Sequence, residues 1–134
     1  MSMYDQVKEF HKATGLPVRD MPIDPDNLSL EDAETYTLRA SLVEEEYKEF
    51  EKAMDNGDLV EIADAIMDLH YVLSGTSVSF GIPEDACFRE VQRSNMSKLN
   101  ADGSVNRRED GKILKGDHFS EPDLESIIYA GSEA

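Results

Sequence analysis

The stretch EEYKEFEKAMDNGDLVEIADAIMD, residues 45–68, decides the fold, because it holds the end of one helix, a turn and the start of the next helix. Asp55-Asn56-Gly57 supplies the turn, and the glycine can take the left-handed conformation that ends a helix. Asp58 can then cap the second helix. Two long helices joined by so short a connection must lie antiparallel.

Periodic apolar residues extend this pair in both directions. Ser29 is a candidate N-cap for a helix over about 30–54, and the next helix is expected to run to about Ser79. Further helices are expected over residues 3–13 and 83–99. Asp102-Gly103 and Asp110-Gly111 are turn dipeptides that predict a short hairpin or ordered loop. The segment 120–123 resembles the cap of a last short helix.

The predicted fold class is therefore all-α, a helical bundle built around a long antiparallel helix pair, with a C-terminal loop or hairpin and a short helix. A chain of 134 residues is most simply one domain, 1–134. Within it, residues 1–28 would form an N-terminal helix and connection, and residues 100–134 a C-terminal extension.

The long helix pair carries two groups of carboxylates. At about 100° per residue, Glu61, Asp64 and Asp68 fall within an arc of about 60° on the second helix. The first helix places three acids within an arc of about 100°: Glu45, Glu46 and Glu49. The hairpin should turn these two arcs toward each other.

Apolar residues flank the second arc on both sides, and no Lys or Arg occurs between Ala53 and Phe88. We therefore expect these carboxylates to be buried without a cation, which costs several kcal/mol each or raises their pKa values. A hard divalent metal ion would remove that penalty, since it prefers oxygen ligands. The alternative is a solvated helix surface, of which an i,i+4 pair such as Glu44 with Lys48 is typical.

Composition excludes several classes of function. The net charge of −16 and the pI near 4.4 argue against binding to nucleic acid or to an anionic membrane surface. The N-terminus lacks the apolar core of a signal peptide, and the single Cys87 cannot form an internal disulfide. A cytoplasmic location is expected. Cys87 and His70 are both expected to be core residues.

The basic residues concentrate in one segment. Seven of the thirteen lie between residues 89 and 115, together with four acids, so the local charge is 7 − 4 = +3. Such a segment could meet the phosphates of a ligand that also binds metal, or it could simply balance an acidic surface. Both interpretations stay open.

A cluster of this many carboxylates needs about two divalent ions to offset its repulsion. Mg²⁺ suits such ligands, with Mn²⁺ as a substitute, and it commonly shares its remaining positions with substrate phosphates and water. A carboxylate beside an activated water can take its proton. The residues therefore point to hydrolysis of a phosphoanhydride.

The spacing Glu45-Glu46-x-x-Glu49 followed by Glu61-x-x-Asp64 resembles the signature of the MazG-like all-α NTP pyrophosphatases. Residues 61–99 and 110–124 are similar to the subgroup related to phosphoribosyl-ATP pyrophosphohydrolase, and the resemblance covers roughly residues 29–125. It implies hydrolysis of a nucleoside triphosphate to the monophosphate and diphosphate with Mg²⁺, two or more ions per site. It also implies a homodimer or homotetramer.

The resemblance assigns roles by position. The metal ligands would be Glu45, Glu46, Glu49, Glu61 and Asp64, with Glu46 as general base. Asp68 would be an outer or alternate ligand near the substrate. Substrate contacts would come from Asn95, Lys98, Lys112 and Lys115.

The substrate itself stays open. Deoxynucleotides are favoured, with dUTP and dGTP as first candidates, while phosphoribosyl-ATP, a nucleoside diphosphate or a modified nucleotide are alternatives. A hypothesis of another class is an acidic helical protein that binds metal or a partner without catalysis.

Overall fold

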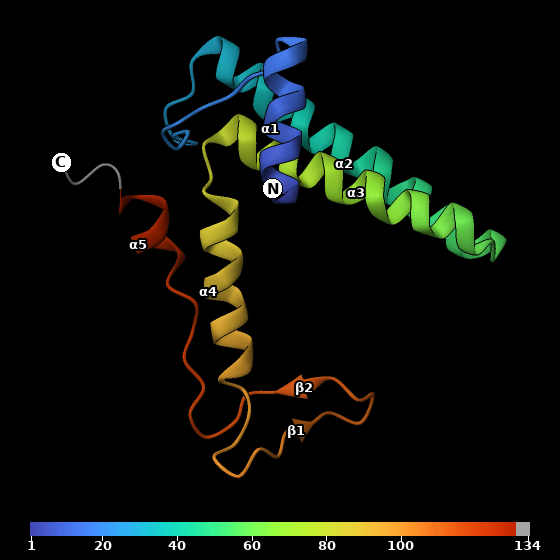
Figure 1. The fold of residues 1–134 in the computed structure, drawn as a ribbon, viewed down its shortest axis with the longest axis vertical. Coiled ribbons are helices and arrows are strands. Elements are labelled where there is room, and N and C mark those ends of the chain that lie inside the picture. Colours follow the sequence, from blue (N-terminus) through green and yellow to red (C-terminus); the bar gives the residue numbers. More distant parts are fainter. Residues whose placement is uncertain (131–134) are drawn as a thin grey trace. The chain divides into compact units, whose positions relative to one another are not determined.

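The computed structural model describes residues 1–130, and the chain divides into two compact units, Met1–Glu84 and Asp85–Ala134. Helices make up most of the first unit, and the second unit combines helices with two short strands that form a two-stranded sheet (Figure 1). The all-α class is confirmed. The single domain over 1–134 stays a prediction, and residues 131–134 of the expected extension lie outside the described part.

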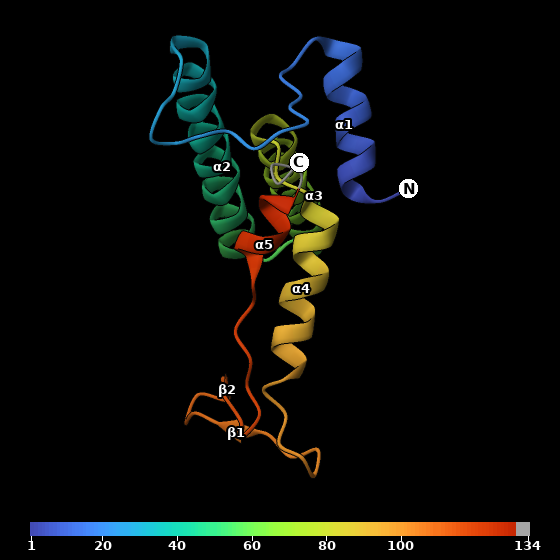
Figure 2. The same ribbon diagram turned by 90° about the vertical axis from the view of Figure 1, so that its left-hand side faces the viewer.

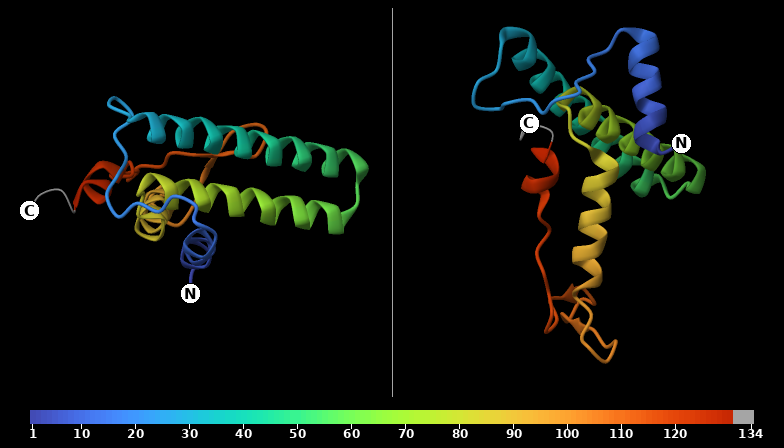
Figure 3. Two further views of the ribbon diagram at one scale, coloured as in Figure 1. Left: turned by 90° about the horizontal axis from the view of Figure 1, so that it is seen from above. Right: turned by 60° about the vertical axis from the view of Figure 1, so that its left-hand side comes forward.

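The first unit is built on the predicted helix pair, α2 (Leu30–Asn56) and α3 (Leu59–Phe80), which lie side by side and antiparallel (Figure 3). Gly57 has φ 66° and donates its N–H to the carbonyl of Ala53, which ends α2. Asp58 accepts hydrogen bonds from the first turn of α3. Only two residues therefore connect the helices, as the turn chemistry predicted.

Helix α1 (Met3–Thr14) packs against α3. Its N-terminus is a capping box in which Ser2 and Asp5 satisfy each other's backbone N–H groups. Val7 is buried, and Phe10 meets Tyr71 edge to face with ring centroids 5.8 Å apart. The N-terminal helix thus covers one side of α3 while α2 covers another.

A buried polar cluster lies where these three helices meet. Arg39 is 6% exposed and donates to the carbonyl of Val72 at 2.7 Å. His11 is 2% exposed, and its Nδ1 donates to the carbonyl of Pro17 at 2.9 Å. A Cβ on Gly75 would lie 2.5 Å from Arg39 Nη2 and 3.0 Å from His11 Nε2. A glycine is therefore required for the guanidinium and imidazole to pack against α3.

The expectation for His70 is wrong, because His70 is exposed on α3 and His11 is the buried histidine. Cys87, expected in the core, is half-buried on α4. The connection between α1 and α2 runs along the end of α3, where Arg19 N bonds to Val78 O and Ile23 N bonds to Phe80 O. This fixes the irregular segment by backbone hydrogen bonds.

The second unit contains α4 (Glu84–Met96), β1 (Asn106–Arg107), β2 (Ile113–Leu114) and α5 (Leu124–Ile128), with Glu84 itself in the first unit. The strands pair antiparallel, with Asn106 opposite Leu114 and Arg107 opposite Ile113, so the predicted hairpin or ordered loop is a hairpin. Helix α4 ends three residues before the expected Leu99, because Ser97–Leu99 continue as turns.

The chain returns from the hairpin alongside α4 (Figure 2). Arg93 on α4 donates to the carbonyl of Glu121 at 3.0 Å, and Ser97 Oγ accepts the N–H of Ser120 at 2.9 Å. Glu90 accepts the N–H of Asp123 at 2.7 Å, and Asp123 in turn caps α5. These bonds hold the returning segment to α4 without a large apolar core.

Candidate functional site

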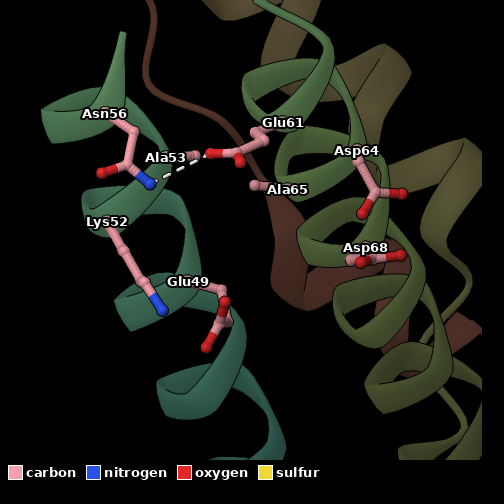
Figure 4. Close-up of a pocket in the computed structure, with 8 residues that line it drawn as sticks. All are labelled: Glu49, Lys52, Ala53, Asn56, Glu61, Asp64, Ala65 and Asp68. Carbon is pink, nitrogen blue, oxygen red and sulfur yellow. Dashed lines mark hydrogen bonds between the residues drawn. The ribbon is translucent and has the colours of Figure 1, made fainter. Parts of the chain in front are cut away.

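The α2–α3 pair forms a pocket of about 270 Å³ that is lined mainly by polar side chains (Figure 4). Helix α2 contributes residues at i, i+3, i+4 and i+7, and α3 does the same. The lining residues are Glu49, Lys52, Ala53, Asn56, Glu61, Asp64, Ala65 and Asp68. The predicted arc on α3 thus lines one pocket together with Glu49, one of the three acids of the predicted arc on α2.

Two alanines explain how the helices come together here. Ala53 is 4% exposed and Ala65 is 5% exposed, so both are buried where α2 meets α3. A methyl side chain at each position lets the helix axes approach closely. The longer carboxylate side chains beside them then extend from the two helices around the pocket.

Glu46 shares this acidic environment although it is not among the lining residues. Partial burial raises its pKa, and so do the negative charges of Asp68, Glu49, Glu45 and Asp64, in that order. Asp68 and Asp64 lie on α3, so Glu46 on α2 experiences the field of the opposite helix. The predicted facing of the two arcs is supported by this coupling.

The expected burial is wrong. Glu49, Glu61, Asp64 and Asp68 are exposed in the single chain, as is Glu45. The reason is that the apolar residues that flank the arc are not covered either: Val60 is 79% exposed and Met67 is 57% exposed. Water therefore solvates these carboxylates, and the expected cost of removing them from water does not arise.

The expectation that no cation lies near these carboxylates is also wrong. Lys52, one turn after Glu49, lines the pocket and contributes a positive charge among the four acids. Asn56 is a second lining residue that the sequence reasoning missed, and its Nδ2 donates to Glu61 Oε2 at 3.1 Å. Both could have been found, since positions 49, 52, 53 and 56 form one face of a helix.

The acidic ligand candidates all offer carboxylate oxygens, which are the ligands that a hard divalent ion prefers. Within residues 1–130, no group of three or more Asp, Glu, His or Cys side chains is already arranged to hold a metal ion. The exposed carboxylates would have to change rotamer to converge on one. Glu49, Glu61, Asp64 and Asp68 line one pocket, and the roles of all the proposed metal ligands stay predictions.

The substrate-binding candidates outside the hairpin all belong to the second unit. Asn95 is exposed on α4, Lys98 is half-buried just after it, and Lys112 is exposed in the hairpin turn. Lys115 lies 3.9 Å from Glu121 and over the ring of Phe119. Their contact with a nucleotide stays a prediction.

Other charged residues form pairs outside the pocket. Glu44 and Lys48 form the expected i,i+4 pair at 3.0 Å, with both side chains more than half exposed. In the basic segment, Arg93 pairs with Glu90 and Arg108 pairs with Asp110. No helix within residues 1–130 is both long and apolar enough to span a membrane.

The fold is all-α, and one helix hairpin carries carboxylates on both of its helices. Comparison with known proteins assigns a chain with these features to a family. The family model for phosphoribosyl-ATP pyrophosphohydrolase matches residues 7–95. The chain belongs to this family, and its expected place among the MazG-like all-α NTP pyrophosphatases is confirmed.

The individual proteins that are similar to the chain include a solved bacterial structure and a viral protein. A crystal structure of "a putative NTP pyrophosphohydrolase" from Exiguobacterium sp. 255-15 matches with a TM-score of 0.51 and 25% identity, covering 99% of this chain and 97% of that one. "Uncharacterized protein L479" of Acanthamoeba polyphaga mimivirus is 30% identical over 106 residues, 78% of this chain. The matched part is 41% of the viral protein's length.

Proposed function

We propose that this chain hydrolyses a (deoxy)nucleoside triphosphate to the monophosphate and diphosphate in the presence of Mg²⁺. The observation that carries the proposal is the pocket between α2 and α3, which is lined by four carboxylates, one from α2 and three from α3. The family to which the chain belongs, and the description of the Exiguobacterium structure, support the same reaction.

Glu49, Glu61, Asp64 and Asp68 would hold the metal, with Glu45 and Glu46 as further ligands, and two or more ions are expected per site. When bound, Mg²⁺ would neutralise charge on the substrate phosphates, and Mn²⁺ would substitute for it. Lys52 would leave the carboxylates and turn toward phosphate or solvent as the ions take over its role of balancing charge.

Glu46 is the proposed general base. A carboxylate beside the attacking water can accept its proton. Water attacks the α-phosphorus, a new phosphorus–oxygen bond forms there, and the bond to the bridging oxygen breaks. Diphosphate leaves with the electron pair, and the proton passes to Glu46.

The basic segment of the second unit would bind the leaving phosphates through Asn95, Lys98, Lys112 or Lys115, in the same or a neighbouring subunit. Exposed apolar side chains on the first unit, such as Leu59 at 78% and Leu38 at 50%, support association into a homodimer or homotetramer. A cytoplasmic location fits the composition.

Phosphoribosyl-ATP is the second candidate substrate, favoured by the family model that matches residues 7–95. Both reactions break the same type of bond and release diphosphate, so one assay can compare the two substrates. Release of diphosphate should be measured with Mg²⁺ for the deoxynucleoside triphosphates, dUTP and dGTP first, and for phosphoribosyl-ATP. The Glu49→Gln variant serves as the inactive control.

Hydrolysis in ¹⁸O-labelled water then tests the position of attack, and the label should enter the monophosphate. Orthophosphate as the primary product would contradict the mechanism. No turnover of any nucleotide, together with retained metal binding, would favour a non-catalytic acidic protein instead.

A further inference from the structure

The loop that joins α4 to the β1–β2 hairpin is organised around the side chain of Asn100. Its Nδ2 donates to Ser104 Oγ and to Asn106 Oδ1, in each case over 3.1 Å. Its Oδ1 accepts the N–H of Asp117, also over 3.1 Å. One half-buried amide thus connects three stretches of the second unit: the chain just after α4, the start of the hairpin and the segment that follows β2.

The segment after β2 approaches the chain after α4 so closely that no side chain would fit between them. A Cβ on Gly116 would lie 2.3 Å from the carbonyl oxygen of Lys98 and 2.6 Å from Asn100 Oδ1. Asn106 Nδ2 adds a hydrogen bond to the carbonyl of Lys115 at 3.2 Å. Lys98 and Lys115, which are far apart in the sequence, are therefore held at adjoining positions of the backbone.

Neither lysine has a strong partner in the described part of the chain. Within residues 1–130, Lys98 forms no ion pair. Lys115 lies 3.9 Å from Glu121, and the two side chains are 65% and 80% exposed, so the pair contributes little. Asp117 is a second exposed acid of the same segment. An anion must therefore carry several charges to compete with these acids for the lysines.

A diphosphate group meets this requirement. A lysine ammonium is a compact charge with three donors on a flexible stem, and two such groups can contact neighbouring phosphates. Ordering two long side chains on binding costs free energy, and fixing the backbone at both of them reduces that cost. The hydrogen bonds of Asn100 supply this fixation.

We propose that Asn100 is a positioning residue, which holds Lys98 and Lys115 together as one binding site for the diphosphate group of the substrate. This inference rests on the proposed function, because it assigns the leaving diphosphate to these two lysines. Without the amide both lysines would remain, but the two stretches that carry them would be free to separate. The loss should fall on binding of the diphosphate group and not on the chemical step.

Asn100→Ala should raise KM for the triphosphate about tenfold, the scale of two ordered side chains, with little change in kcat. The inhibition constant of inorganic diphosphate should rise by a similar factor. The inhibition constant of the nucleoside monophosphate, which lacks the diphosphate group, should stay the same, whereas a general loss of structure would affect both products. Asn27→Ala, at an exposed asparagine between α1 and α2, is the control and should change none of these values.

Two further variants test whether Asn100 acts through the lysines. In the double variant Lys98→Gln/Lys115→Gln, the substitution Asn100→Ala should cause no additional loss of diphosphate binding. Gly116→Ala should reproduce the effect of Asn100→Ala, because its Cβ forces the two stretches apart while every hydrogen-bonding side chain stays.

Calorimetry with inorganic diphosphate in EDTA makes the test independent of metal and of turnover. The unsubstituted protein should bind diphosphate, and Asn100→Ala should bind it about tenfold more weakly. No binding by the unsubstituted protein, or no effect of Asn100→Ala, overturns the inference and leaves the proposed hydrolysis standing. Equal effects on both products, or a further loss in the double lysine variant, do the same. Diphosphate binding that depends on Asn100, in a protein that hydrolyses no triphosphate, overturns the function and leaves the anion site.

Discussion

Asn56 in the last turn of α2 donates a hydrogen bond from Nδ2 to Oε2 of Glu61 in the first turn of α3, over 3.1 Å (Figure 4). The bond spans the two-residue connection and holds a proposed metal ligand by a neutral partner. A partner of this kind orients a carboxylate without adding charge to the pocket.

Replacing Asn56 by Leu should therefore weaken metal binding while the chain still folds. We expect the Mg²⁺ concentration at half-maximal activity to rise by about tenfold, the lower end of what loss of such a partner causes. A Mg²⁺ titration of activity and of the melting temperature checks this. Asn27→Leu in the exposed connection is the control, and an equal effect of both variants would contradict the role of Asn56.

Divalent ions should stabilise the folded protein. At a concentration a hundred times the Kd, ligand binding to the native state alone adds about 2.7 kcal/mol to the free energy of unfolding. Melting curves in Mg²⁺, in Mn²⁺ and in EDTA measure the difference. Identical curves and identical activity in all three would show that the pocket is not a metal site.

Removing single carboxylates should separate activity from stability. Glu49→Gln and Asp64→Asn should each lower kcat/KM by about a hundredfold or more, since each loses a group that acts on the transition state. The metal-free melting temperature should stay the same or rise, because repulsion within the cluster falls. Glu44→Gln, whose partner is Lys48, should change neither quantity. An equal loss of activity in Glu44→Gln would mean that the wrong face of α2 was assigned.

Lys52 should act as an internal counter-charge when no metal is present. Lys52→Met is expected to lower the metal-free stability by about 0.5 kcal/mol, the scale of an exposed ion pair. The stabilisation by Mg²⁺ should grow by the same amount, because the ions then relieve more repulsion. Lys48→Met is the matched control on the same helix. If the stability of both variants changed equally, in EDTA and in Mg²⁺, the special role of Lys52 would be contradicted.

The attachment of the C-terminal segment to α4 should depend on pH. The Arg93 guanidinium and the N–H of Asp123 lower the pKa of Glu90 to about 2, against about 4.3 for an unperturbed glutamate. Because the folded-state value is the lower one, the stabilisation is present above about pH 4.3 and is lost as the pH falls from there toward 2. The protection factors of residues 120–128 against hydrogen exchange should fall across that window.

Glu90→Gln should give fast exchange of the same residues already at pH 6. Glu109→Gln, at an exposed acid of the hairpin, should leave the exchange unchanged. If acid and the Glu90→Gln substitution left residues 120–128 equally protected, their attachment would rest on other contacts.

The helix hairpin could be predicted because its signals are local. Gly57 and Asp58 set the turn by backbone conformation and capping, which depend on a few neighbouring residues. The same holds for Ser29 at the start of α2 and for Asp123 at the start of α5. Helical spacing then placed Glu49 and Asp64 on facing sides before any tertiary contact was known.

Burial could not be predicted in the same way. Exposure of Asp64 and Asp68 depends on what covers Val60 and Met67, and periodicity does not distinguish a face covered by the same chain from one left open. The buried Arg39 escaped prediction for a related reason. Its hydrogen bonds to Val72 and Thr76 depend on Gly75, thirty-six positions away in the sequence, which leaves space for the guanidinium.

The two-residue connection between α2 and α3 makes the site sensitive to chain length as well as to residue type. With 3.6 residues per turn, one residue inserted between Glu61 and Asp64 would rotate Asp64 and Asp68 by about 100° relative to Glu61. Every carboxylate would still be present, yet the two arcs would no longer face each other. Insertions and deletions in residues 46–68 should therefore be far less tolerated than most substitutions there, and natural length variation should be confined to other parts of the chain.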